Sequence, residues 1–363
     1  MVFSHLRWTG VWQRPQHIVS RLAAQFRRTI FVEEPAMEPT VTRPHLRSEM
    51  CGSVERVWLE VPGPPGHCDF LDERAAVYGD LIAQRYGVAP EVAWLYTPLA
   101  FTLAAALTPT TVVFDVMDDL SAFAHASPHL RFEHERALAS CDVVFTGGQS
   151  LQRATAQHRP DASCYPSGVE IEHYGRSVQQ RLSSRERPVA GYVGVLDERL
   201  DLALLDTMAG LLHDWDIHLV GPVTKIDPAT LPAAPNVFYL GAMPYDDLPE
   251  VMAGFDVALM PFALNESTRS ISPTKSLEYL AAGLPVVSTR VPDVVADLSA
   301  FVELADDGEA FALACRRLAA TQPDARHAAV QALLRWNQWD AIVDRMSNEL
   351  TNAAQRVSLQ AAL

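Results

Sequence analysis

The chain has 363 residues, of which 48% are hydrophobic and 20% are charged, and its formal net charge is −15. This composition indicates a folded globular protein rather than a disordered one, and the length favours two domains over one core. The acidic balance argues against non-specific nucleic-acid binding, although it is compatible with a local basic pocket for a small anion.

The cysteines and the first residues of the chain indicate a reducing compartment. The five cysteines include no C-x-x-C pair, so we expect neither a zinc site nor a disulfide framework. The start, "MVFSHLRWTG", lacks a basic segment followed by an apolar run, and no apolar run reaches the roughly 18 residues that cross a bilayer. We therefore expect a cytoplasmic protein without a signal peptide or transmembrane segment, and peripheral membrane contact stays open.

Short apolar runs alternate with helical patterns through the first half of the chain. The apolar runs predict buried strands of a parallel sheet at residues 29–35, 92–98, 111–119 and 142–148. Helical patterns lie between them, at residues 15–27, 70–86 and 130–140. This alternation predicts a doubly wound α/β domain, to which we assign residues 1–185.

The same alternation restarts near residue 188. Further strands are expected at residues 188–196, 216–222, 236–244, 256–262 and 285–289. The polar stretch 175–187 marks the boundary, and the second domain covers residues 186–335. A long amphipathic helix is predicted over 333–355, with an apolar stripe made by Trp336, Trp339, Ile342, Val343, Met346 and Leu350. Packing against the protein is the default expectation for this stripe, and docking of a partner helix is the alternative.

The segment "SISPTKSLEYLAAGLPVVST" (270–289) contains one of only two lysines, Lys225 and Lys275. Ser272 is a good helix N-cap and Pro273 suits the first helical position, so Lys275 falls in the first turn. A positive charge is disfavoured there unless an anion sits at the helix end, which predicts a phosphate site. Glu278 lies one turn further on, where a carboxylate could accept hydrogen bonds from ribose hydroxyls. The alternative is an exposed lysine paired with Glu278.

Several segments, taken in order, resemble retaining glycosyltransferases of family 4, which have the GT-B fold. "SPTKSLEYLAAGLPVVST" looks like their donor-binding segment. One bacterial subgroup is similar over nearly the whole chain, in "WQRPQHIVSRLA" (12–23), "VVFDVMDDLSAF" (112–123), "PSGVEIEHY" (166–174), "GYVGVLDERLD" (191–201) and "NVFYLGAMPYDDLP" (236–249). The resemblance implies two doubly wound Rossmann-like domains facing a cleft, with the C-terminal helix, residues 336–363, crossing back towards the N-terminal domain.

The resemblance also implies a donor site in the second domain. Arg199 would join Lys275 on a nucleotide diphosphate, Gly10 and Gly194 would lie close to it, and Glu278 would take the ribose. A salt bridge with the neighbouring acidic residues is the alternative for Arg199. The backbone around Gly241, Met243 and Tyr245 would read the nucleobase, which leaves UDP, GDP and dTDP donors open. The remaining donor-binding candidates are Ser272, Thr274 and Ser276.

Two features depart from the family pattern or lack assigned chemistry. The family has a second glutamate eight positions before the ribose glutamate, and here that position is Ser270, which leaves the transferred sugar open. On the acceptor side, Trp12, Arg14 and His17 are expected to line the cleft, with packing of their loop as the alternative for Trp12 and Arg14. Asp118 and Asp119 end a strand there. Asp118 is a candidate for holding sugar or acceptor hydroxyls, and metal binding by this pair is the alternative to our prediction of no metal.

The resulting hypothesis is a hexosyltransferase that moves a sugar from a nucleotide diphosphate sugar to an acceptor hydroxyl, with retention and without a metal or other cofactor. Lys275, Arg199 and the helix end would stabilise the departing diphosphate, with Asp118 as a further catalytic candidate. The acceptor could be a small molecule, a lipid-linked sugar or a glycan. The rivals are a non-catalytic sugar-nucleotide-binding subunit, an epimerase, or a phosphorylase that binds pyridoxal phosphate on the spare Lys225.

Overall fold

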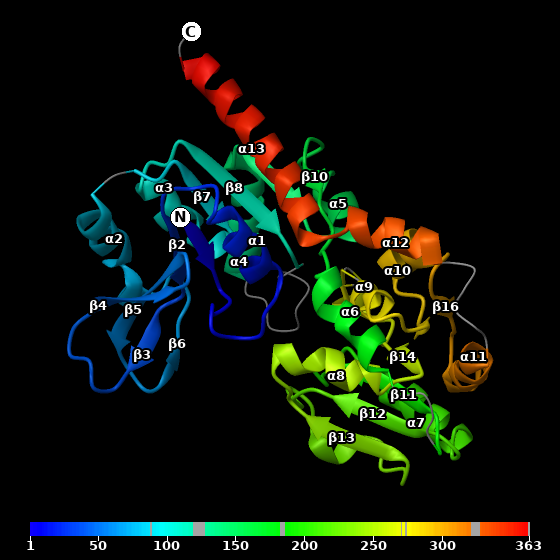
Figure 1. Cartoon of the computed structure of the whole chain (residues 1–363). Coiled ribbons are helices and arrows are strands. Elements are labelled where there is room, and N and C mark those ends of the chain that lie inside the picture. The colour runs from blue at the N-terminus through cyan, green and yellow to red at the C-terminus, as the bar shows by residue number, and fades with distance from the viewer. Residues whose placement is uncertain are drawn as a thin grey trace. The chain divides into compact units, whose positions relative to one another are not determined.

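The protein, described by a computed structural model, divides into two compact units (Figure 1). Unit 1 comprises Met1–Pro166 together with Ile342–Leu363, and unit 2 comprises Ser167–Ala341. The structure describes residues 1–87, 89–118, 128–181, 186–269, 271–272, 274–320 and 327–361. The structure divides the chain after Pro166, before helix α6 (Ile171–Gln180), whereas the sequence led us to expect the division after residue 185. The domain assignment stays a prediction.

Unit 1 is built on a sheet with strand order β10-β9-β8-β7-β1-β2-β5-β3-β6, in which β4 also pairs with β5. Its central parallel strands are β1 (Val2–Ser4), β2 (Thr29–Glu33), β7 (Val92–Leu95), β8 (Thr111–Val116), β9 (Val143–Thr146) and β10 (Ser163–Cys164). Strands β2 and β9 are buried along their whole length, as expected of strands covered on both faces. The order reverses at β1, which pairs with β2 on one side and with β7 on the other.

The outer part of this sheet was not predicted. It consists of β3 (Ala36–Glu38), β4 (His45–Cys51), β5 (Val54–Pro62) and β6 (Gly66–His67). Strands β4 and β5 form an antiparallel hairpin, and Gly52 at its turn has a φ of 62°, which favours glycine. Residues of β5 alternate between buried and partly exposed, which is the period-two pattern of a half-covered strand.

The helices of unit 1 include the C-terminal one. They are α1 (Arg14–Leu22), α2 (Tyr78–Tyr86), α3 (Phe101–Ala106), α4 (Pro128–Ser140), α5 (Gln149–Thr155) and most of α13 (Trp339–Ala361). The apolar stripe of α13 is buried, and Glu349 accepts hydrogen bonds from Ser163 and Tyr165, each at 2.7 Å. The prediction for Trp336 is wrong: it ends α12 (His327–Trp336) and is 65% exposed, because the helix is interrupted before α13 begins.

Unit 2 holds a second parallel sheet, of order β13-β12-β11-β14-β15-β16. Its strands are β11 (Val189–Val193), β12 (Asp216–Val220), β13 (Val237–Gly241), β14 (Val257–Met260), β15 (Val286–Ser288) and β16 (Glu303–Leu304). Its helices are α6, α7 (Leu202–Leu211), α8 (Leu248–Ala253), α9 (Thr274–Ala281), α10 (Pro292–Leu298), α11 (Gly308–Ala319) and α12. The order reverses between β11 and β14, so a ligand site is expected at the carboxyl ends of these strands.

Each unit has a hydrophobic core of its own. The core of unit 1 includes Phe3, Tyr78 and Leu95, and that of unit 2 includes Phe255 and Leu259. Two separately packed α/β units with parallel sheets are the architecture predicted from the alternating strands and helices. In the part of the chain that the structure describes, no helix is both long enough and apolar enough to cross a membrane.

Candidate active site

Two glycines at the carboxyl edge of the unit 2 sheet create the space for Lys275. Gly194 follows β11 with a φ of +156°, and a Cβ built on it would lie 2.5 Å from both Cε and Nζ of Lys275. Gly221 follows β12 with a φ of +143°, and a Cβ there would lie 1.9 Å from the carbonyl oxygen of Gly194. The missing side chain of Gly221 therefore leaves room for the carbonyl group of Gly194, and the missing side chain of Gly194 leaves room for the side chain of Lys275.

Lys275 is a half-buried cation at the start of a helix. It lies in the first turn of α9, which follows β14, and its Nζ is 5.7 Å from the ring centroid of Tyr192. Among the described residues, no carboxylate oxygen lies within 4.0 Å of this nitrogen, so the predicted alternative of a lysine paired with Glu278 is not formed. Burial lowers the pKa of Lys275, although the more distant charge of Glu278 opposes this. A helix N-terminus and an uncompensated ammonium together favour an anion.

The other lysine provides a contrast. Lys225 is 61% exposed at its side chain, and its Nζ lies 3.8 Å from Glu198. Its φ of 61° is unusual for a residue with a side chain. Of the two lysines, Lys275 is therefore the one that the fold withdraws from solvent.

Glu278 lies one turn after Lys275 and is also half-buried. Burial raises the pKa of its carboxyl group, whereas the charge of Lys275 and a hydrogen bond from Tyr174 lower it. Glu278 thus lies one helical turn from Lys275, and its contact with ribose hydroxyls stays a prediction.

Arg199 is near Lys275 but has a partner of its own. Its Nε donates to Oδ1 and Oδ2 of Asp197 at 2.9 and 3.0 Å, and a terminal nitrogen donates to Oδ2 at 2.6 Å. Asp197 is only 3% exposed. This is the salt bridge weighed as the alternative for Arg199, and its phosphate contact stays a prediction.

The hydroxyl groups beside Lys275 have different surroundings. Ser272 Oγ accepts a hydrogen bond from the backbone N–H of Ser167 at 3.3 Å, and Thr274 is half-buried. Ser276 is fully buried and its hydroxyl lies 2.8 Å from the sulfur of Met260, so this side chain packs in the core instead of facing a ligand. Ser270 and Pro273 lie outside the described residues.

The segment expected to read a nucleobase follows β13. Gly241 has a φ of +71°, and its carbonyl accepts a hydrogen bond from the N–H of Gly221 at 2.8 Å. Met243 is 37% exposed. Tyr245 opens the short helix η5 (Tyr245–Asp247), and its hydroxyl donates to Glu170 at 2.5 Å. The Gly221 contact brings the ends of β12 and β13 together in one edge of unit 2.

The candidates of unit 1 surround the start of α1. Gly10 is exposed in the loop after β1, and its N–H donates to the carbonyl of Arg7 at 3.1 Å. Trp12 is 37% exposed, and its Nε1 donates to Nδ1 of His17 at 3.0 Å, while His17 itself is buried. This loop is therefore held by its own contacts.

Arg14 is buried in a charge pair. Its Nε and one terminal nitrogen bind Asp115 on β8 at 2.9 to 3.2 Å, and the other terminal nitrogen donates to the carbonyl of Tyr165 at 2.7 Å. Arg14 is thus tied to β8 and to the backbone at Tyr165, and its place in the cleft stays a prediction. Asp118 is half-buried just after β8, and Asp119 lies outside the described residues. No group of three or more potential metal-ligating side chains occurs within the described ranges.

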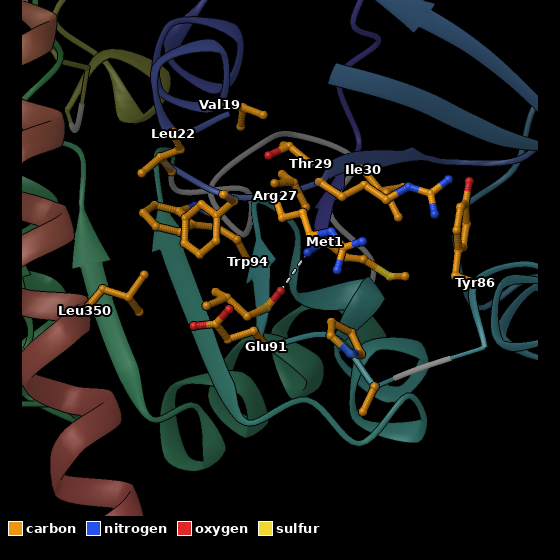
Figure 2. A pocket seen from close by; sticks show the side chains of 16 residues that line it. Met1, Val19, Leu22, Arg27, Thr29, Ile30, Tyr86, Glu91, Trp94 and Leu350 are labelled. Carbon is orange, nitrogen blue, oxygen red and sulfur yellow. Dashed lines mark hydrogen bonds between the residues drawn. The ribbon is translucent and has the colours of Figure 1, made fainter. Parts of the chain in front are cut away.

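A cavity of about 230 Å³ in unit 1 lies at the opposite edge of its sheet. Figure 2 shows Leu22, Trp94 and Leu350 among the side chains that surround it, together with Arg27 and Glu91. It adjoins the first residues of β1, β2 and β7, whereas ligands of parallel sheets bind at the carboxyl ends. This cavity is therefore not part of the candidate site, which lies at the carboxyl ends of the strands.

Sequence reasoning missed three residues of this arrangement. Gly221 carried only the weak signal of a glycine directly after a predicted strand. Tyr192 sits inside β11, and Tyr174 sits on α6, where a buried tyrosine has no pattern that separates a polar contact from simple packing.

Comparison with known proteins bears on both units. Residues 187–321 match the family described as "Glycosyl transferases group 1". Over 173 residues the chain is 29% identical to "Putative teichuronic acid biosynthesis glycosyltransferase TuaH" of Bacillus subtilis strain 168. That alignment covers 46% of this chain and 43% of the relative, so the chain spans less than half of the length of this curated protein.

Solved structures match over nearly the full length. An alpha,alpha-trehalose-phosphate synthase (UDP-forming) from Burkholderia xenovorans, in complex with glucose-6-phosphate, has a TM-score of 0.71 at 16% identity and covers 96% of this chain and 99% of its own. Anabaena HepE, in complex with UDP and glucose, has a TM-score of 0.68 at 15% identity and covers 96% and 98%. The predicted fold class is confirmed: the chain has the GT-B fold, and its residues 187–321 are similar to the group 1 glycosyl transferases.

Proposed function

We propose that this protein transfers a sugar from a nucleotide diphosphate sugar to an acceptor hydroxyl. The observation that carries the proposal is Lys275, a half-buried ammonium at a helix start with no carboxylate within 4.0 Å among the described residues. A lone charge in such a place is costly unless a ligand of opposite charge completes it. The match of residues 187–321 to the group 1 glycosyl transferases supports a sugar nucleotide as this ligand.

The proposed chemistry needs stabilisation of the departing diphosphate. Lys275 and the N-terminus of α9 would face the phosphates, the glycines 194 and 221 would allow the backbone to approach them, and Glu278 would bind the ribose hydroxyls. Charges held in advance where negative charge develops lower the barrier without a metal. Retention of configuration, membership of family 4 and its "WQRPQ" bacterial subgroup, and hexosyl transfer are parts of this proposal.

The acceptor would come to unit 1. Trp12, His17 and Asp118 stand near the carboxyl ends of β1 and β8 and are the residues we propose to contact it. A small molecule, a lipid-linked sugar or a glycan is compatible with this part of the proposal, as is action in the cytoplasm with peripheral membrane contact. Because Anabaena HepE, which has the same fold, was solved with UDP and glucose, UDP-sugars are the first donors to test.

The test is a thermal-shift panel with UDP, GDP, dTDP and ADP on the wild type, Lys275→Ala and Lys225→Ala. A diphosphate that binds the folded state raises the melting temperature by mass action. We expect a shift with one of them that Lys275→Ala loses and the exposed-lysine control Lys225→Ala keeps. No shift with any nucleotide at millimolar concentration, or equal loss in both variants, would overturn the proposal.

Turnover is tested next with the nucleotide sugar that carries the binding base. Release of nucleoside diphosphate that depends on an added acceptor, with an unchanged anomeric configuration in the product by NMR and no loss in EDTA, is the expected result. Binding without turnover across acceptors would instead support a non-catalytic sugar-nucleotide-binding subunit.

A further inference from the structure

Lys275 contacts an aromatic ring instead of a carboxylate. Its Nζ lies 5.7 Å from the ring centroid of Tyr192, a side chain of strand β11 that is 1% exposed. Among the described residues, no carboxylate oxygen lies within 4.0 Å of this nitrogen, although Glu278 follows three positions later on the same helix. Opposite charges at that spacing are neighbours on a helix surface and commonly pair. The contact with the ring therefore replaces the ion pair that the sequence would allow.

The ring of Tyr192 is itself held by three contacts. Its hydroxyl donates to the carbonyl oxygen of Val195 at 3.1 Å, which ties the ring to the turn after β11. A Cβ built on Gly194 would lie 2.7 Å from this hydroxyl and 2.5 Å from Nζ of Lys275, so both groups share the space of the missing side chain. The ring also meets Phe262 in a T-shaped contact, with a centroid distance of 6.4 Å and an interplanar angle of 82°. The ring therefore offers the ammonium one fixed place.

An aromatic ring holds a cation without neutralising it. The negative face of the ring quadrupole attracts the ammonium, and this attraction is stronger where water is excluded. A carboxylate would instead form a charge-assisted hydrogen bond with the ammonium, which an incoming phosphate would have to break. A lysine held by a ring therefore keeps its charge available for an anion.

We propose that Tyr192 is a positioning residue, whose ring holds the ammonium of Lys275 apart from Glu278, so that the ammonium stays available for a phosphate and the carboxylate for ribose hydroxyls. The inference rests on the proposed sugar-nucleotide function. The hydroxyl of Tyr192 serves this role indirectly, because its bond to Val195 fixes the ring. Without the ring, Lys275 and Glu278 would pair with each other, and that pair would have to open before a donor could bind.

The contact itself is tested by NMR on protein labelled with carbon-13 at Cε of lysine. The sequence has only two lysines, so two signals are expected, and Lys225→Ala assigns them. Because Lys275 lies over a ring, its Hε signal should appear upfield of that of Lys225. The upfield shift should persist in Tyr192→Phe, which keeps the ring, and disappear in Tyr192→Leu. A Lys275 signal that Tyr192→Leu does not move would overturn the inference, whether or not a nucleotide binds.

Nucleotide binding is measured by calorimetry with UDP and GDP. We expect Tyr192→Leu to weaken binding about tenfold, because the ring contact is lost and Glu278 competes for the ammonium. Tyr192→Phe should stay within about twofold of the wild type, because it keeps the ring. The control is Tyr78→Leu in unit 1, which removes another buried tyrosine whose hydroxyl donates to a backbone carbonyl, that of Glu33 at 2.9 Å. The control should match the wild type in binding.

A double variant shows whether the effect passes through Glu278. Glu278→Gln removes the carboxylate that would compete for Lys275. In this background, Tyr192→Leu should weaken nucleotide binding only about threefold, because only the ring contact is lost. Equal loss in the two backgrounds, or equal loss in Tyr192→Phe and Tyr192→Leu, would overturn the inference.

The outcomes also distinguish the two proposals. If the wild type binds UDP or GDP and Lys275→Ala loses that binding while Tyr192→Leu keeps it, the inference about Tyr192 is wrong and the proposed function stands. If the wild type binds neither nucleotide at millimolar concentration, the proposed function is overturned and the inference with it, even where the lysine signal shows the ring contact.

Discussion

Replacing Lys275 with methionine should stabilise the unliganded protein while abolishing its nucleotide binding. Methionine keeps the length of the side chain and removes a half-buried charge that has no carboxylate within 4.0 Å in the described ranges. An effective cost of several kcal/mol for a buried ion is partly offset by Tyr192, 5.7 Å away, at about 1 kcal/mol, and by the more distant Glu278. The net gain expected from Lys275→Met is about 2 kcal/mol, or about 5 °C in melting temperature.

The pH dependence of this gain follows from the sign of the shift. Folding lowers the pKa of Lys275 below its ordinary value of 10.5, so the unfolded chain holds this proton more tightly than the folded one. The cost of the charge is therefore complete below the folded-state pKa and disappears as pH rises through 10.5. Lys275→Met should exceed the wild type in stability at pH 7.5 and approach it near pH 10.5.

Urea denaturation at both pH values measures this, with Lys225→Met as the control at an exposed, ion-paired lysine. The control should stay within about 0.5 kcal/mol of the wild type, as surface substitutions do. If Lys275→Met is less stable than the wild type at pH 7.5, the ammonium is satisfied within the protein, and the reasoning that it awaits an anion is refuted.

Four other substitutions test further contacts in the two units. Gly194→Ala should cost about 1–2 kcal/mol of stability because of its φ of +156°, and it should weaken nucleotide binding at least tenfold by displacing Lys275. Gly221→Ala should cost more stability, because its Cβ would lie 1.9 Å from a backbone oxygen. Urea denaturation measures the stability of both variants, and calorimetry measures their nucleotide binding. Arg14→Ala leaves Asp115 buried without its partner and should cost about 3–5 kcal/mol in thermal unfolding; a loss under about 1 kcal/mol would contradict a buried pair. Burial raises the pKa of Glu34 to about 8, with Asp69 adding to this rise and Arg7 opposing it, so the wild type loses stability as pH rises from 4.5 through 8. Glu34→Gln should match the stability of the wild type near pH 4.5 and exceed it by up to about 4 kcal/mol above pH 8. Equal pH profiles of stability for the two proteins would argue against the shift.

The sequence predicted the parallel strands of both units well, because strands covered on both faces leave continuous apolar runs. The β4–β5 hairpin was not predicted, because β5 alternates buried and partly exposed residues and has no continuous apolar run. Helix position was less certain at the C-terminus, where a break at residues 337–338 leaves Trp336 exposed.

For the site, local rules reached Lys275 and Glu278, which share one helix of eight residues. These rules did not predict Gly221, because its role depends on a contact with Gly194 at the end of another strand. They did not predict Tyr174 either, because it approaches Glu278 from a helix about 100 residues earlier. Ser276 was misplaced for a related reason: its position beside Lys275 indicated the site, whereas the turn of the helix directs its hydroxyl to the sulfur of Met260.

The two cations near the candidate site are held in opposite ways, and this difference bears on how a diphosphate could bind. Asp197 already accepts three hydrogen bonds from the side chain of Arg199, so this pair contributes little net charge. Lys275 has no such partner within the described residues, and the glycines at 194 and 221 fix the space that it occupies. A diphosphate carries more negative charge than one ammonium and a helix end supply, and a chain of net charge −15 offers no general positive field. Under the proposed function, Lys275 would attract the first phosphate, and Arg199 would join it only by exchanging Asp197 for a phosphate oxygen.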